Sequence, residues 1–126
     1  MKNILTLIKT YWIALSLVIL AIITVLSLWP LDTLPEAPGS DKLHHFIAYA
    51  FLILPASVRK HHQLIRLFLL YTAYSAAVEL IQPYVNRYCD WRDLLANVSG
   101  LACGVVLAVI FNFLFPTNTV TPLRNG

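Results

Sequence analysis

The chain has 126 residues, which is room for one domain, and 59% of them are hydrophobic against 12% charged. Soluble domains carry about 25% charged residues, and a domain this small has too little interior to bury so much apolar surface, so the composition indicates a membrane protein. The net charge of +3 comes without a long basic run, so nucleic-acid binding is not expected.

Four apolar stretches predict transmembrane helices, because about twenty apolar residues cross a bilayer as a helix. They lie at about residues 11–29, 43–58, 64–85 and 94–115. The first stretch follows two basic residues, Lys2 and Lys9, as the apolar core of a signal peptide does. It is longer than a usual signal-peptide core, however, and no small-residue cleavage site follows it. It ends at Trp29 and a proline, so we expect a retained span.

The second stretch is the shortest, and it has His44 and His45 at one end, where they can reach water. Pro55, near its other end, should bend or fray the helix. With short connecting loops, the expected fold class is all-α: an integral membrane bundle of four transmembrane helices with both termini on the same side. The bundle forms a single domain over residues 1–126, and residues 116–126 are expected to be a flexible tail.

Orientation follows from lysine and arginine, which are enriched in cytoplasmic segments. With the N-terminus inside, the inner segments contain six such residues: Lys2, Lys9, Arg59, Lys60, Arg66 and Arg124. The outer loops contain three, Lys42, Arg87 and Arg92, together with the acids Asp32, Glu36, Asp41, Asp90 and Asp93. We therefore expect both termini to be cytoplasmic.

In this orientation, polar residues with unusual positions gather in the outer third of the bundle. Asp41, His45 and Tyr49 recur every four residues and share one helix face. An acid that starts a helix and an interfacial histidine would also give this pattern.

Glu79 and Gln82 share a face of the third span, just before Pro83. A carboxylate inside a span is costly and usually faces the bundle interior. A structural pair with Arg87 or His45 and a role in ligand binding are equally compatible with this position.

The last span starts with Asp93 and Asn97, and Gly100 and Gly104 continue the same face. Asp90 is the expected N-cap of this helix, and the two glycines are expected to allow close helix packing. Capping accounts for one acid, but it does not account for Asn97, which lies a full turn inside the helix.

The segments DKLHHFIAY, ELIQ and NRYCDWRDLLANVSG, followed by Gly104, resemble the VanZ-like family of small bacterial membrane proteins. The family pattern falls on Asp41, Lys42, His45, Phe46, Tyr49, Glu79, Gln82, Arg87, Asp93, Asn97 and Gly100, within about residues 41–105. The resemblance implies a four-helix bundle in the bacterial cytoplasmic (inner) membrane. It also links the family to reduced susceptibility to the glycopeptide teicoplanin, without a biochemical mechanism.

The favoured function is binding of an anionic lipid or a lipid-linked cell-envelope precursor at the extracytoplasmic end of the bundle. Lys42 and Arg87 would bind its phosphate, because the planar guanidinium binds phosphate oxygens bidentately. The expected ligand-binding residues are Asp41, Lys42, His45, Tyr49, Glu79, Gln82, Arg87, Asp93 and Asn97. No cofactor and no metal are assigned, and the oligomeric state is not predicted.

The alternative is a membrane-embedded enzyme that acts on a phosphate-bearing lipid, with His45, Glu79 and Asp93 as candidates for acid–base catalysis. A divalent metal bound by these three residues is a variant of that hypothesis. No known nucleophile, zincin or phosphatase motif is present in the sequence. A further alternative is that the motif residues only stabilise the bundle.

Overall fold

The computed structural model describes residues 2–30, 39–59 and 62–116. In chain order it contains α1 (Lys2–Thr10), α2 (Trp12–Ser27), α3 (Asp41–Val58), α4 (Leu64–Ile81), the 3-10 helix η1 (Gln82–Val85) and α5 (Trp91–Leu114). No β-strand occurs in these ranges, so the all-α fold class is confirmed. The expected flexible tail lies, after Pro116, outside the described residues.

Two segments are long and apolar enough to cross a membrane: Leu64–Val85, which is α4 continued by η1, and α5. A third is possible if α1 and α2 together form one span, although they are bent by 75° at the break between them. α3 has 18 residues, but its polar first turns lower its mean hydropathy below that of these helices. By length and composition, the described residues thus support two or three spans, and the expected fourth span stays a prediction.

The short helix α1 is the main departure from the expected elements. It is amphipathic, and Leu5 on its buried face packs with Val58 of α3 and Ala108 of α5. The guanidinium of Arg59 also donates a hydrogen bond of 2.7 Å to the Lys9 carbonyl. These contacts fix α1 at an angle to α2, so the first apolar stretch is preceded by a separate helix.

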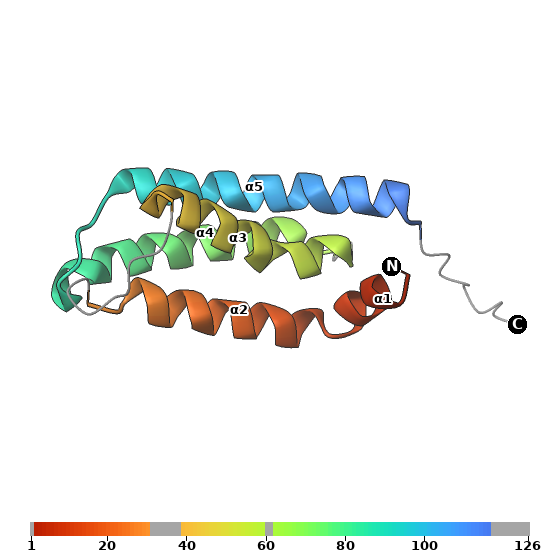
Figure 1. Ribbon diagram of the computed structural model, residues 1–126, viewed down its shortest axis with the longest axis horizontal. Coiled ribbons are helices and arrows are strands. Elements are labelled where there is room, and N and C mark those ends of the chain that lie inside the picture. Colours follow the sequence, from red (N-terminus) through yellow and green to blue (C-terminus); the bar gives the residue numbers. More distant parts are fainter. Residues whose placement is uncertain (1, 31–38, 60–61, 117–126) are drawn as a thin grey trace, which may run out of the picture.

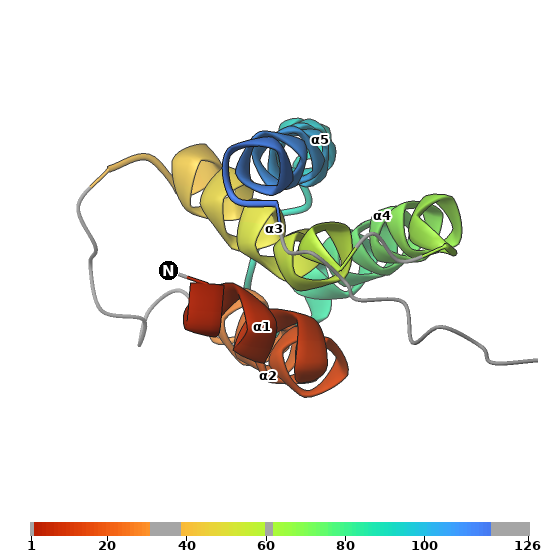
Figure 2. The same cartoon turned by 90° about the vertical axis from the view of Figure 1, so that its right-hand side faces the viewer.

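The helix α3 lies between the other helices of the bundle. Figure 1 shows α5 and α2 on opposite sides of it, and the end-on view in Figure 2 shows α4 alongside. Its contact with α5 is the most extensive in the molecule. The core around it contains Tyr49, Leu52, Ile53, Tyr71 and Leu101.

Two glycines of α5 explain this close contact. A methyl group at Gly104 would lie 2.5 Å from the Ala50 carbonyl oxygen, and one at Gly100 would overlap the Phe46 carbonyl oxygen. The backbones of α3 and α5 therefore touch directly, as the small-residue spacing predicted. Pro55 does not end α3, which continues to Val58, and the amide of Arg59 donates to the Pro55 carbonyl at 3.2 Å.

The two ends of the bundle differ in character. At one end, the start of α1, the end of α3 and the end of α5 pack together through Leu5, Val58 and Phe115. At the other end lie the start of α3, the end of α4 and the start of α5. The polar residues singled out in the sequence lie at this second end.

Candidate functional site

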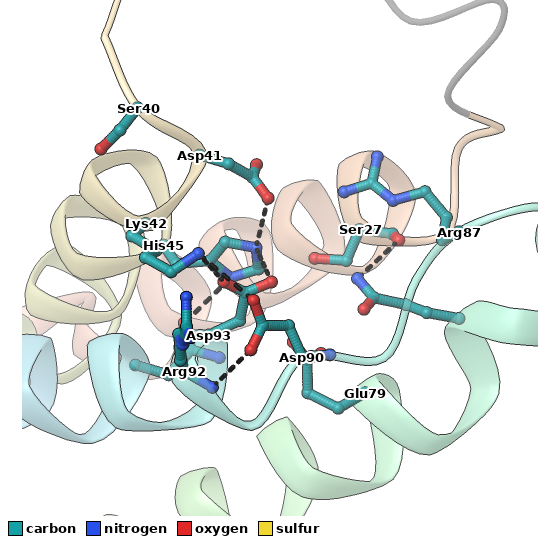
Figure 3. A network of polar contacts seen from close by, with 12 residues as sticks. Ser27, Ser40, Asp41, Lys42, His45, Glu79, Arg87, Asp90, Arg92 and Asp93 are labelled. Atoms are coloured by element: carbon teal, nitrogen blue, oxygen red, sulfur yellow. Dashed lines mark hydrogen bonds and ion pairs between the residues drawn. The ribbon is translucent and has the colours of Figure 1, made fainter.

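Capping interactions fix where the two helices of the site begin. The Ser40 hydroxyl accepts a hydrogen bond of 3.1 Å from the Leu43 amide at the start of α3. Asp90 accepts one of 2.9 Å from the Arg92 amide at the start of α5, so Asp90 is the N-cap that the sequence predicted. Because both helices start at the same level, their first turns face each other (Figure 3).

Lys42 joins these two helices. Its Nζ lies 3.3 Å from Asp90 Oδ2 and 3.5 Å from Asp93 Oδ1. The hydrogen bond from the Arg92 amide, assisted by Lys42, lowers the pKa of the Asp90 carboxyl below its ordinary value. The ammonium is therefore already engaged by two carboxylates.

His45 is buried, and hydrogen bonds that involve Asn97 and Ser75 fix its orientation. Its Nδ1 lies 3.0 Å from Asn97 Oδ1, and the Asn97 amide nitrogen donates to Ser75 Oγ at 2.5 Å. The Asn97 oxygen is thus the acceptor, so His45 carries a proton on Nδ1. Its Nε2 faces Asp41 Oδ2 at 3.8 Å and Asp93 Oδ2 at 3.9 Å.

Asn97, which capping could not account for, therefore orients the histidine. Ser75 completes this arrangement and was not among the predicted site residues. It is fully buried in α4, one turn before Glu79, and the spacing of four between two polar residues in an apolar span could have indicated it.

Glu79 is only 4% exposed, yet it forms no ion pair with the described residues. Its Oε2 accepts a hydrogen bond of 3.4 Å from the backbone amide of Asp90. The structural hypothesis expected an ion pair between Glu79 and either Arg87 or His45, and neither pair forms among the described residues. The carboxylate instead contacts the loop that leads into α5.

Gln82 and Arg87 connect the same loop to α2. The Gln82 side chain donates to the Ser27 carbonyl at 3.2 Å, and Arg87 Nη1 donates to the Trp29 carbonyl at 3.4 Å. The Arg87 amide donates to the Gln82 carbonyl at 3.0 Å, which couples the two residues. The site therefore includes the end of α2, a helix without motif residues.

A groove of about 560 Å³ runs between α2 and α3 toward this site. Apolar side chains form most of its wall, including Ile19, Ile22 and Leu26 of α2 and Phe51 of α3. At its polar end it is lined by Ser27, Asp41, His44, His45 and Arg87.

The groove divides the nine predicted ligand-binding residues into two groups. Four of them line it: Asp41, His45, Tyr49 and Arg87. The other five are not lining residues, and they connect or support the first group: Lys42, Glu79, Gln82, Asp93 and Asn97. Tyr49 is also part of the core, with 1% of its surface exposed.

One group of side chains could bind a metal ion. Asp41, His45 and Asp93 each offer one ligand atom, and these atoms lie within 4.8 Å of one another. Glu79, which the sequence-based variant included, is not a member of this group; Asp41 takes its place.

A family model described as VanZ/LLP1 matches residues 3–112 of the chain. This match spans most of the chain, so the protein belongs to the VanZ/LLP1 family, and the family indicated by the motif residues is confirmed. No curated protein and no solved structure matches the chain.

Proposed function

We propose that this VanZ/LLP1 protein binds an anionic lipid, or a lipid-linked cell-envelope precursor, in the groove between α2 and α3. The observation that supports this function is the amphipathic wall of the groove, which is apolar along the helices and polar at its end, where Arg87 and Asp41 both line it. In our proposal the chain is a four-span protein of the bacterial cytoplasmic membrane, and this end is extracytoplasmic.

The apolar part of the groove suits a hydrocarbon chain. From Ile19 to Ser27 it follows α2 for about 12 Å, at 1.5 Å per residue. Its volume of about 560 Å³ falls within the roughly 300–1,000 Å³ that is typical of small-molecule sites. Several of its apolar residues are exposed in the isolated chain, as Ile22 and Phe51 are, and an acyl chain would cover them.

The polar end suits a phosphate-bearing headgroup. Arg87 is 8% exposed, and its guanidinium is turned toward the start of α3, where Asp41 lies (Figure 3). Among the described residues its side chain makes one hydrogen bond, to Trp29, while a guanidinium has five N–H donors. Because Lys42 is paired with Asp90 and Asp93, Arg87 is the residue that binds the phosphate, and Asp41 accepts hydrogen bonds from headgroup hydroxyls.

An effect on teicoplanin susceptibility would follow from this binding. A protein that sequesters a lipid-linked cell-wall precursor changes how much of that precursor is accessible at the outer surface.

The test uses purified protein in nanodiscs and two short-chain fluorescent lipids, phosphatidylglycerol and phosphatidylcholine. Ala48→Leu places a larger side chain in the groove wall and should weaken binding of both lipids about tenfold. Ala77→Leu, on the exposed face of α4, is the matched control and should have no effect. Equal results for the two leucine variants would show that the groove is not the binding site.

The headgroup contact is tested separately. Arg87→Gln should reduce binding of phosphatidylglycerol about tenfold, because hydrogen bonds to charged groups contribute about 1.5–3 kcal/mol, and should leave phosphatidylcholine unchanged. Arg92→Gln removes an exposed arginine from the first turn of α5 and serves as the control. If both variants lose the same selectivity, the preference reflects overall charge and not the site.

A second candidate function is acid–base catalysis on the bound lipid. The observation that favours it is the position of His45, which lines the groove and has its Nε2 between two carboxylates. Glu79 and Asp93, the other catalytic candidates, are not lining residues. His45→Gln would then abolish turnover of a phosphate-bearing lipid while its binding persists.

A further inference from the structure

Three ligand atoms converge at the polar end of the groove. His45 Nε2 lies 3.8 Å from Asp41 Oδ2 and 3.9 Å from Asp93 Oδ2. Bonds from zinc to nitrogen or oxygen are about 2.1 Å long, so two ligand atoms of one tetrahedral zinc ion are about 3.4 Å apart. Both nitrogen–oxygen distances exceed this separation by roughly half an ångström. The ligand atoms of all three residues lie within 4.8 Å of one another, so binding would draw the most distant pair together by up to about 1.4 Å.

The histidine is already oriented as metal-binding histidines are. Its Nδ1 donates to Asn97 Oδ1 at 3.0 Å, and Ser75 fixes the Asn97 amide. Metal-binding histidines almost always donate their other ring N–H to an acceptor of this kind. With the proton on Nδ1, the lone pair of Nε2 points at two carboxylate oxygens, which is repulsive unless a second proton or a metal cation lies between them.

Acceptors at the site also favour a cation. Lys42 pairs with Asp90 and Asp93, and the guanidinium groups of Arg87 and Arg92 lie at the same end of the bundle. Asp93 is 5% exposed, and its Oδ1 accepts no hydrogen bond from the described residues. The same is true of Glu79 Oε1. Lys42 approaches Asp93 through Oδ1, whereas His45 faces Oδ2, so the ammonium and a metal ion would use different oxygens.

We propose that Asp41, His45 and Asp93 bind a divalent transition-metal ion, and that zinc fits this set best. Imidazole suits zinc, and the two carboxylates complete a three-residue set like those of zinc sites that keep an open position for water or substrate. Asp41 and His45 line the groove, so the open position would face its polar end. This site goes beyond lipid binding, and zinc binding is measured without any lipid ligand.

The test is isothermal titration of zinc chloride into the full chain, purified in detergent, freed of any histidine tag and stripped with EDTA. The parent should bind one zinc ion per chain, and zinc should raise its melting temperature. Asp41→Asn should weaken binding by about tenfold or more and abolish the thermal shift. The Asp41 side chain is 63% exposed, so this substitution leaves the bundle folded.

Asp90→Asn is the matched control. It removes the same charge from the same cluster, and asparagine caps a helix about as well as aspartate. Zinc affinity should stay within about threefold of the parent, since Asp90 contributes no ligand. A second control is the double variant His61→Gln with His62→Gln. It removes two consecutive histidines that are not part of the proposed site, and it should also leave zinc binding unchanged.

Three results would overturn the site. These are no saturable zinc binding by the parent, equal weakening by Asp90→Asn and Asp41→Asn, and loss of binding in the His61/His62 variant. The second would indicate a nonspecific acidic surface, and the third would place the ion elsewhere. None of these results bears on lipid binding, which Ala48→Leu and Arg87→Gln test.

Discussion

The carboxylate of Glu79 is buried at the end of a predicted span, and its contact explains why an acid can lie there. It accepts a hydrogen bond from the backbone amide of Asp90, and the Asp90 side chain in turn caps α5 and contacts Lys42. The end of α4, the start of α5 and the start of α3 are thus joined through one residue. Asp90 is thus the residue that contacts both Glu79 and Lys42, and none of the described residues forms an ion pair with Glu79.

We expect Glu79→Gln to melt within a few degrees of the parent in detergent. Glutamine keeps an oxygen that can accept the Asp90 amide, and the lost charge has no ion-pair partner among the described residues. Glu79→Ala removes the acceptor and should cost about 1–3 kcal/mol, because it leaves a backbone donor unsatisfied. Thermal unfolding of both variants compares the two effects. If Glu79→Gln unfolds as early as Glu79→Ala, the charge itself stabilises the bundle and the hydrogen bond is secondary.

At the scale of elements, the contact between α3 and α5 positions the site, because His45 and Lys42 come from one helix and Asp93 and Asn97 from the other. This contact depends on the two glycines of α5. A helix with larger residues at these positions would stand further from α3 and would separate His45 from Asn97.

Gly104→Ala should therefore destabilise the bundle, although alanine is favoured over glycine in helices by about 1 kcal/mol. The new methyl group would lie 2.5 Å from the Ala50 carbonyl oxygen and 2.7 Å from a methyl carbon of Ile53. Overpacking of this kind costs about 1–3 kcal/mol and should exceed the propensity gain. Ser99→Ala, at an exposed position of the same helix, is the control for thermal unfolding. A Gly104→Ala variant at least as stable as the parent would mean that α3 and α5 can separate without cost.

Sequence periodicity was sufficient to predict α3, α4 and α5 and the faces that Asp41, His45 and Asp93 share, because helix geometry fixes such faces locally. It did not predict α1, because this helix precedes the apolar stretch and its nine residues are too few to span a membrane. The contacts of Gln82 and Arg87 with α2 were also unpredictable, because their acceptors are backbone carbonyls, which any residue type provides.

In the molecule as a whole, basic side chains lie at both ends of the bundle. The end where α1 meets the end of α3 has Lys9 and Arg59, while the opposite end contains Lys42, Arg87 and Arg92 together with the acids Asp41, Asp90 and Asp93. Basic residues concentrate on the cytoplasmic side of membrane proteins, and acids contribute little to this rule. The extracytoplasmic position of the site therefore depends on the six-to-three count of basic residues in the sequence and stays a prediction.

Cys89 provides a direct measurement of this orientation. It is exposed in the loop before α5, beside the site, whereas Cys103 is half-buried within α5. In a Cys103→Ala background, a membrane-impermeant maleimide should label Cys89 in intact spheroplasts, because the loop is expected to face outward. A matched variant with Cys89→Ser, Cys103→Ala and His62→Cys places a single thiol at the opposite end and should react only after permeabilisation. The reverse pattern would mean that the groove opens toward the cytoplasm, and its ligand would then be a lipid or precursor of the inner leaflet.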